Sequence, residues 1–138
     1  MPRPAPSLDQ LAEQAGGGRG PSLSGRWLAL ISHRQGRDQV QLLDLERRLA
    51  VPLPGLNPAD AQPLSVSVDG AGERLAVVRL RQERTELVLY RRSMVSSEPI
   101  AILPAGVPRQ VALQADGRQL AVQVSRGGLW QVDLIRLP

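Results

Sequence analysis

Short apolar runs, separated by turn residues, recur along this chain and set its expected architecture. In "DGRQLAVQVSRGGLWQVDL", Asp116 to Leu134, a turn, an apolar run, a second turn and a second apolar run follow one another. The runs are rich in Leu and Val and too short for helices, so they predict β-strands. Neither run alternates cleanly between apolar and polar residues, which is typical of strands that are covered on both faces.

The same pattern occurs three times. Aligned on Gly25, Gly72 and Gly117, which are 47 and 45 residues apart, the chain reads "GRWLALI", "GERLAVV" and "GRQLAVQ". Without a gap, each copy then reaches a second run, "QVQLLDL", "ELVLYRR" or "QVDLIRL". A repeat of about 45 residues with several short strands is the size of one propeller blade.

Two further segments complete the blade. "LSVSV" and "RQVAL", ahead of the second and third glycines, alternate and predict an inner strand. "AVPLPGL" and "PIAILPA" follow the first two copies and predict outer strands, because proline is tolerated at a sheet edge. Four strands in meander order make a propeller blade. We therefore expect an all-β chain with three blades at about 22–60, 61–106 and 107–138, after an N-terminal segment, 1–21, that is flexible or forms a short helix over "SLDQLAEQAGGG".

Composition excludes several classes of site. The chain has 138 residues, a net charge of +4, no Cys and no Phe, and all of its basic side chains are Arg. Disulfides, thiolate metal sites and a cysteine nucleophile are therefore excluded. No apolar run has the length of a membrane helix.

Particular motifs resemble a known family. "SVSVDG", "RLAVV" and "ELVLYRR" resemble the TolB-like propeller repeat, and "LALISHRQGRDQVQLLDL" followed by "VPLPGLN" is similar to short TolB-like proteins of cyanobacteria. The Tyr-Asp of that repeat is replaced by Leu43-Asp44, Tyr90-Arg91 and Ile135-Arg136. The resemblance implies a non-enzymatic propeller fragment that acts by protein contact, without a cofactor, in the periplasm or on a lipid anchor. No signal is visible in the sequence, so a cytoplasmic location stays open.

Three blades do not close a ring, since closed propellers have about four to eight. Both end blades would expose an apolar face, and the third copy lacks an outer strand. We expect half of a six-bladed propeller that homodimerisation completes. The alternative is a monomeric fan whose ends the N-terminal segment covers.

Arginines recur in the turns between the two central strands, which a propeller places on one rim. The ninth residue after each reference glycine is arginine, and further arginines lie nearby; the set is Arg34, Arg37, Arg79, Arg81, Arg84 and Arg126. Guanidinium groups form bidentate hydrogen bonds with carboxylates, so this rim is a candidate surface for an acidic protein. The alternative is local pairing with Asp38, Glu83 and Glu86 or with the neighbouring blade. Nucleic acid is disfavoured, because the three aromatic residues, Trp27, Tyr90 and Trp130, fall in predicted core strands.

No catalytic pattern emerges. His33 is the only histidine, and Asp38, Asp44, Asp60, Asp69 and Asp116 are scattered through turns. "GGGRG" lacks the residues of a phosphate loop and is read as a linker. The sequence thus favours a non-enzymatic interaction module or small scaffold. The alternative is a carbohydrate-binding or hydrolytic propeller with a site at the central channel.

Overall fold

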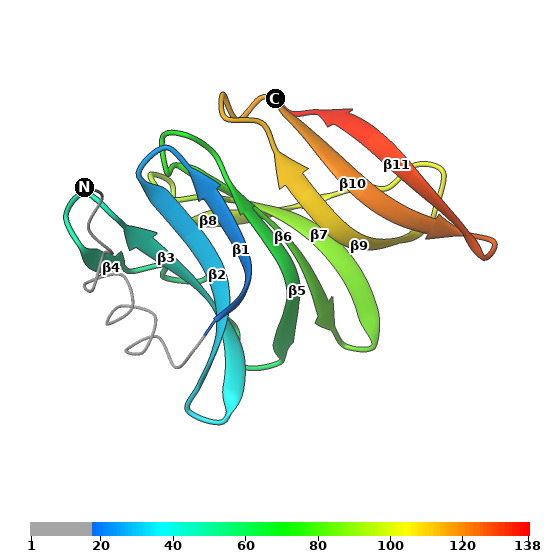
Figure 1. The fold of residues 1–138 in the computed structure, drawn as a ribbon. Coiled ribbons are helices and arrows are strands. Elements are labelled where there is room, and N and C mark those ends of the chain that lie inside the picture. Colours follow the sequence, from blue (N-terminus) through cyan, green and yellow to red (C-terminus); the bar gives the residue numbers. More distant parts are fainter. Residues whose placement is uncertain (1–17) are drawn as a thin grey trace, which may run out of the picture.

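The computed structural model describes residues 18–138, which form eleven strands and no helix. The strands make three antiparallel sheets that stand side by side like the blades of an open fan (Figure 1). Each sheet follows the chain in meander order, so the three predicted blades are confirmed. The expected N-terminal helix and linker lie outside the described residues, apart from the last residues of the linker.

The first two blades have four strands each. Those of blade 1 are β1 (Arg19–Ser24), β2 (Trp27–Arg34), β3 (Arg37–Asp44) and β4 (Leu49–Val51). Those of blade 2 are β5 (Ala61–Val68), β6 (Arg74–Arg81), β7 (Arg84–Arg91) and β8 (Ser96–Ile100).

Blade 3 has three strands, and they are β9 (Val107–Leu113), β10 (Gln119–Arg126) and β11 (Leu129–Arg136). Its last strand, β11, is therefore the edge of the sheet within the described chain, where β4 and β8 close the other two blades.

The hairpins between the central strands have tight two-residue turns. Gln82 and Glu83 both have positive φ, 52° and 63°, as do Gly127 and Gly128 at 55° and 81°. Two successive residues with positive φ suit the right-handed twist of paired strands. Gln35 and Gly36 have the same sign of φ in blade 1. The tips of these three hairpins lie at one rim of the fan (Figure 1).

Apolar side chains fill the two spaces between blades. We call the side of a blade that faces the following blade its forward face, and the opposite side its rear face. Leu42 on the forward face of blade 1 packs with Val77 and Tyr90 on the rear face of blade 2, and all three are no more than 1% exposed. Leu89 of blade 2 packs with Val122 of blade 3 in the same way.

Serines join the inner strands of consecutive blades. The backbone N–H of Val68 donates to Ser22 Oγ at 3.2 Å, and the N–H of Leu113 donates to Ser67 Oγ at 2.8 Å; each pair is 46 residues apart. Ser65 Oγ accepts from the N–H of Val111 over the same sequence distance. These bonds use amides that face away from their own sheet, and they fix the position of one blade on the next.

Several boundaries differ from the sequence prediction. The first strand begins at Arg19, inside the segment expected to precede blade 1. The outer strands begin earlier than predicted, at Leu49 and Ser96. The first ends at Val51, where proline follows at once, and the second ends at Ile100, where the chain leaves the sheet. Ser96 and Ser97 therefore belong to the strand β8.

Candidate functional site

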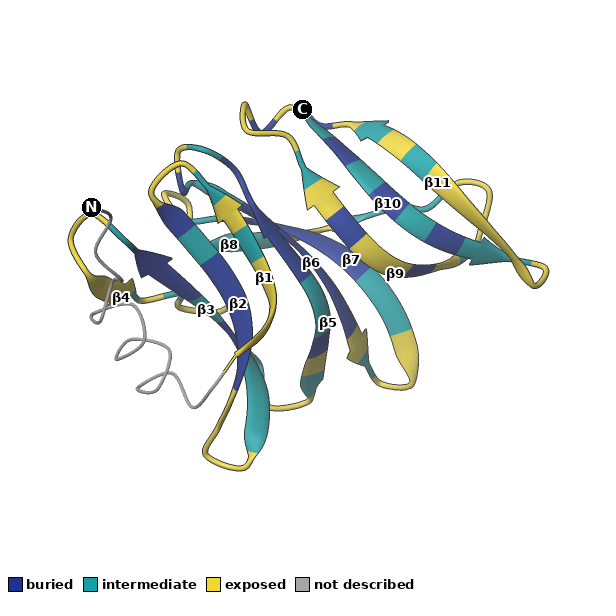
Figure 2. Cartoon of the chain, in the orientation of Figure 1, coloured by how far each residue is buried: buried dark blue, intermediate teal, exposed yellow. Residues whose placement is uncertain are grey.

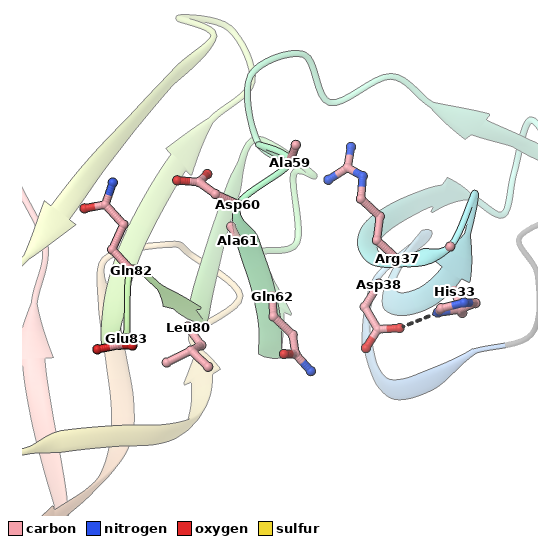
Figure 3. A pocket seen from close by; sticks show the side chains of 11 residues that line it. His33, Arg37, Asp38, Ala59, Asp60, Ala61, Gln62, Leu80, Gln82 and Glu83 are labelled. Carbon is pink, nitrogen blue, oxygen red and sulfur yellow. Dashed lines mark hydrogen bonds and ion pairs between the residues drawn. The ribbon is translucent and has the colours of Figure 1, made fainter.

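Two surfaces of the fan carry features that a partner could use. The first, which we call the turn face, is the rim formed by the three hairpin tips. A hollow of about 490 Å³ opens there between the tips of blades 1 and 2 (Figure 3). Asp38 and Arg37 line one side of it, and Gln62 and Glu83 line the other.

One carboxylate in this hollow is held ionised. His33 Nδ1 lies 3.0 Å from one oxygen of Asp38, and an Arg19 nitrogen lies 2.6 Å from the other. The hydrogen bond with His33, and after it that with Arg19, lowers the pKa of Asp38 below its usual value. Arg19 offsets the charge of Asp38, and the guanidinium of Arg37 adds a positive charge on this side of the hollow.

The arginines of the turn face are mostly bound within the chain. Arg37 donates to the carbonyl oxygens of Asn57 and Pro58, both at 3.1 Å. Arg81 pairs with Asp60 at 3.1 Å. These contacts relieve the repulsion that the pairing of β2 with β3 and of β6 with β7 creates, since in each hairpin two arginines stand directly opposite each other.

Two other predicted rim residues lie elsewhere or are fully engaged. Arg79 is only 5% exposed, pairs with Glu86 at 2.8 Å and donates to the Leu56 carbonyl, so it lies inside the fold rather than on the rim. Arg126 binds both oxygens of Asp133 and donates to the Pro104 carbonyl.

Arg34 and Arg84 are the two remaining arginines of the predicted rim. Both are exposed, and neither makes an ion pair or side-chain hydrogen bond with the described residues.

The second surface is the forward face of blade 3, which we call the open end. Its apolar side chains are exposed: Trp130 by 55%, Val132 by 67% and Leu134 by 69%. The residues that match Leu134 in the repeat, Leu42 and Leu89, are 0% and 1% exposed. The open end thus has the residues of a packing face without anything packed on it in the described chain (Figure 2).

The predicted core position of Trp130 is therefore wrong. Trp27, in the first blade, is buried between Arg26 and Arg92, whose guanidinium carbons lie 5.0 and 5.1 Å from the ring centre. Among the described residues, Arg109 lies above the Trp130 ring, at 5.8 Å. Within residues 18–138 no further sheet packs on this side of blade 3.

A second hollow, of about 550 Å³, lies along the outer edge of β11. Consecutive residues from Val132 to Arg136 form one side, and Leu103 and Pro104, in the connection between β8 and β9, form the other. Leu103 is 80% exposed. At one end, the hydrogen bonds from Arg126 lower the pKa of Asp133, which keeps this carboxylate ionised and Arg126 in place.

The two ends of the fan are not alike. On the rear face of blade 1, Leu30 and Leu43 are 4% and 1% exposed and pack with Leu28 and Leu45. A Cβ on Gly18 would lie 3.0 Å from Leu30, so the chain approaches this face closely. The expectation of an exposed apolar face at each end thus holds for the third blade and is wrong for these buried positions of the first.

Features of other kinds of site are absent from the described part of the chain. No group of three or more His, Cys, Asp or Glu side chains within residues 18–138 is arranged to hold a metal ion. Nor does any helix of residues 18–138 have the length and apolarity needed to cross a membrane.

Solved structures share this arrangement of blades. TolB from Acinetobacter baumannii is similar with a TM-score of 0.66 and 17% identity, over 88% of this chain and 30% of that one. The chain has a TolB-like β-propeller fold. The β-propeller domain of the Trilobed protease from Pyrococcus furiosus is similar with a TM-score of 0.56 and 15% identity, over 77% of this chain and 33% of that one. An acylaminoacyl peptidase is similar with a TM-score of 0.52 and 14% identity, over 80% of this chain and 18% of the peptidase chain.

These comparisons concern the fold alone, because the identities are low. The chain spans about a third of the length of the first two structures, so it corresponds to part of a propeller. No family model and no curated protein matches the sequence.

Proposed function

We propose that this chain is a non-enzymatic protein-interaction module whose main binding surface is the open end of blade 3. The observation that carries the proposal is the exposure of Val132 and Leu134, at positions where the other two blades bury the same kind of side chain. An exposed apolar sheet face of this kind marks an interaction surface more often than a surface left to water. Trp130, beside them, is a residue type that is enriched among the strongest contributors to protein interfaces.

The turn face is the second contact in this proposal. Arg34 and Arg84 would orient an acidic partner, since they are exposed and have no described partner of their own. Their contribution to affinity is smaller than that of the open end, because exposed ion pairs contribute only about 0–1 kcal/mol each. Arg37 would add to the positive potential of the rim while it keeps its contacts with two backbone carbonyls. Arg81 and Arg126 would add little, because Asp60 and Asp133 offset their charges.

A site-specific cross-link tests the function directly. A photoreactive amino acid at Val132, introduced in the native cell, should join the chain to one defined protein, which is then identified and purified. With that protein, Leu134→Ser should weaken binding by roughly tenfold or more. Leu23→Ser is the matched control, because Leu23 is 67% exposed on blade 1, away from the open end. Equal affinity for the two variants would contradict the assignment of the open end.

The same purified partner tests the turn face. Arg34→Ser combined with Arg84→Ser should lower the affinity and reduce its dependence on salt, because two charges leave the interface. Arg47→Ser combined with Arg118→Ser removes the same charge from exposed positions in other turns and should leave binding unchanged. If both double variants bind alike, the arginines of the turn face have no part in recognition.

A further inference from the structure

We propose that the outer edge of β11 binds one extended segment of the partner protein, which pairs antiparallel with β11 as the missing fourth strand of blade 3. This inference rests on the proposed function and names the kind of partner that the open end takes. Its basis is the repeat itself, because two of the three blades show the same edge with its strand in place.

The filled edges give the register. In blade 1, β4 pairs with β3 so that Leu42 stands opposite Val51, and in blade 2, β8 pairs with β7 so that Leu87 stands opposite Ile100. The residues of β11 that match Leu42 and Leu87 are Leu134 and Val132. An added strand would therefore place residues opposite both of them, on the same side of the sheet.

Within residues 18–138, the edge of β11 has unpaired backbone groups at the same two positions. In blade 1, the N–H of Val40 donates to Asn57 Oδ1 at 2.7 Å and its carbonyl accepts from Asn57 Nδ2 at 3.0 Å, so both groups of Val40 point away from β2. Backbone groups alternate in direction along a strand with a period of two. Val132 matches Val40 in the repeat, so the N–H and C=O groups of Val132 and Leu134 point to the open edge. Unpaired groups of this kind are the template for strand addition.

Space for the strand is already present. The hollow of about 550 Å³ lies beside these residues, and Leu103 and Pro104 bound it on the far side. Leu103 offers the incoming segment an apolar contact, as it is 80% exposed. The hollow thus lies where a strand added to this edge would run.

Three observations speak against another propeller blade as the occupant. Ser67, which receives the amide of the next inner strand, is replaced in blade 3 by Ala112, and Ser65 is replaced by Gln110. Gln123 stands where the forward faces of the other blades have Ile31 and Val78. The rear face of blade 1, which a second copy would have to supply for a six-bladed ring, is already buried at Leu30 and Leu43.

The chemistry of the segment follows from the strands that occupy the other edges. It is extended and carries an apolar residue opposite Val132, where β8 has Ile100. Opposite Leu134 it takes either an apolar or a charged residue, since β4 has Val51 at this place and β8 has Glu98. Proline is tolerated between the two positions, because Pro99 stands opposite Val88, whose backbone groups point toward β6, so no donor is lost. A segment with a charged residue opposite Val132 would not bind.

A synthetic peptide with the sequence "SSEPIAI", residues 96–102 of this chain, is the probe. Added to the full chain, it should bind with a change in Trp130 emission. Amide hydrogen exchange followed by NMR should show Val132 and Leu134 exchanging freely without peptide and protected with it. The amide of Asp133 points to β10 and should be protected in both states. A peptide methylated on the backbone nitrogen that corresponds to Ile100 should bind roughly tenfold or more weakly, because a ladder hydrogen bond is lost.

Three outcomes would overturn the inference. Equal binding of the methylated peptide, or unchanged exchange at Val132 and Leu134, would show that no strand is added at this edge. Protection of both amides without peptide, together with a mass of two chains in light scattering, would assign the edge to a second copy. In each case a partner that is sensitive to Leu134→Ser would still support the open end as a binding face, so failure of the strand inference is distinguishable from failure of the function.

Discussion

Alanine at Gly72 should destabilise the fold by about 1–3 kcal/mol or more beyond the effect of alanine at Gly25, although the two glycines occupy the same place in the repeat. Both have positive φ, +66° and +58°. A non-glycine residue in this conformation costs about 1–2 kcal/mol, and this cost is common to both variants. The surroundings differ: a Cβ at Gly72 would lie 2.2 Å from the Trp27 ring, whereas at Gly25 the nearest atom is a carbonyl oxygen at 3.4 Å.

The ring of Trp27 cannot move aside easily. It is 8% exposed and lies between Arg26 and Arg92, and Arg92 also donates to the Gly72 carbonyl at 2.7 Å. Overpacking of a filled core costs about 1–3 kcal/mol or more, in addition to the backbone strain. Urea unfolding of both variants measures the difference. Equal losses would show that Trp27 does not pack on blade 2 through Gly72, which would contradict the contact between the first two blades.

The second prediction compares two leucines that match in the repeat. Leu89→Ala should cost about 2–5 kcal/mol, because Leu89 is 1% exposed and its removal leaves a cavity between blades 2 and 3. Leu134→Ala should change the free energy of unfolding by less than about 0.5 kcal/mol, as is usual for exposed substitutions. Leu134 is 69% exposed, so its loss creates no cavity.

Thermal or urea unfolding at low protein concentration gives both values on the same assay. A loss for Leu134→Ala that approaches that of Leu89→Ala would mean that the forward face of blade 3 is covered in solution. In that case the face would be a core surface of the isolated protein, and the proposed binding surface would be wrong.

Much of the fold could be predicted from the pattern of residues, because the repeat brings the same side chains to the same places. The alignment on three glycines placed Leu42, Leu89 and Leu134 together, and the structure confirms their common position in the blade. Their burial could not be predicted, since it depends on whether a further blade follows. The repeat specifies the face that each blade presents, and within residues 18–138 no sheet covers this face in blade 3.

The inner strands carry a further pattern of serines. Ser22 and Ser67 precede blade-joining amides by 46 residues in both cases. A serine that recurs near the blade spacing predicts a contact between consecutive blades, and Ala112 stands at this position in the third blade. This pattern predicts the contact only when it is known which face of the strand each residue occupies.

The register of the hairpins explains some of the partners that the arginines bind. Arg79 and Glu86 stand directly opposite each other on paired strands, so their ion pair follows from the hairpin alone. Arg81 and Arg37 find partners in the connection between β4 and β5, at Asp60 and Asn57, which are 21 and 20 residues away. Contacts of that range depend on how a loop crosses the rim, and no local pattern specifies this.

The accessibility of Trp130 to a small quencher tests the central claim most directly. Emission from the wild-type chain should contain a component that acrylamide quenches strongly, measured at a concentration where light scattering gives the mass of one chain. Trp130→Phe should remove that component and leave only the protected emission of Trp27, which is 8% exposed against 55% for Trp130. Protected emission from both tryptophans in the single chain would contradict an open third blade.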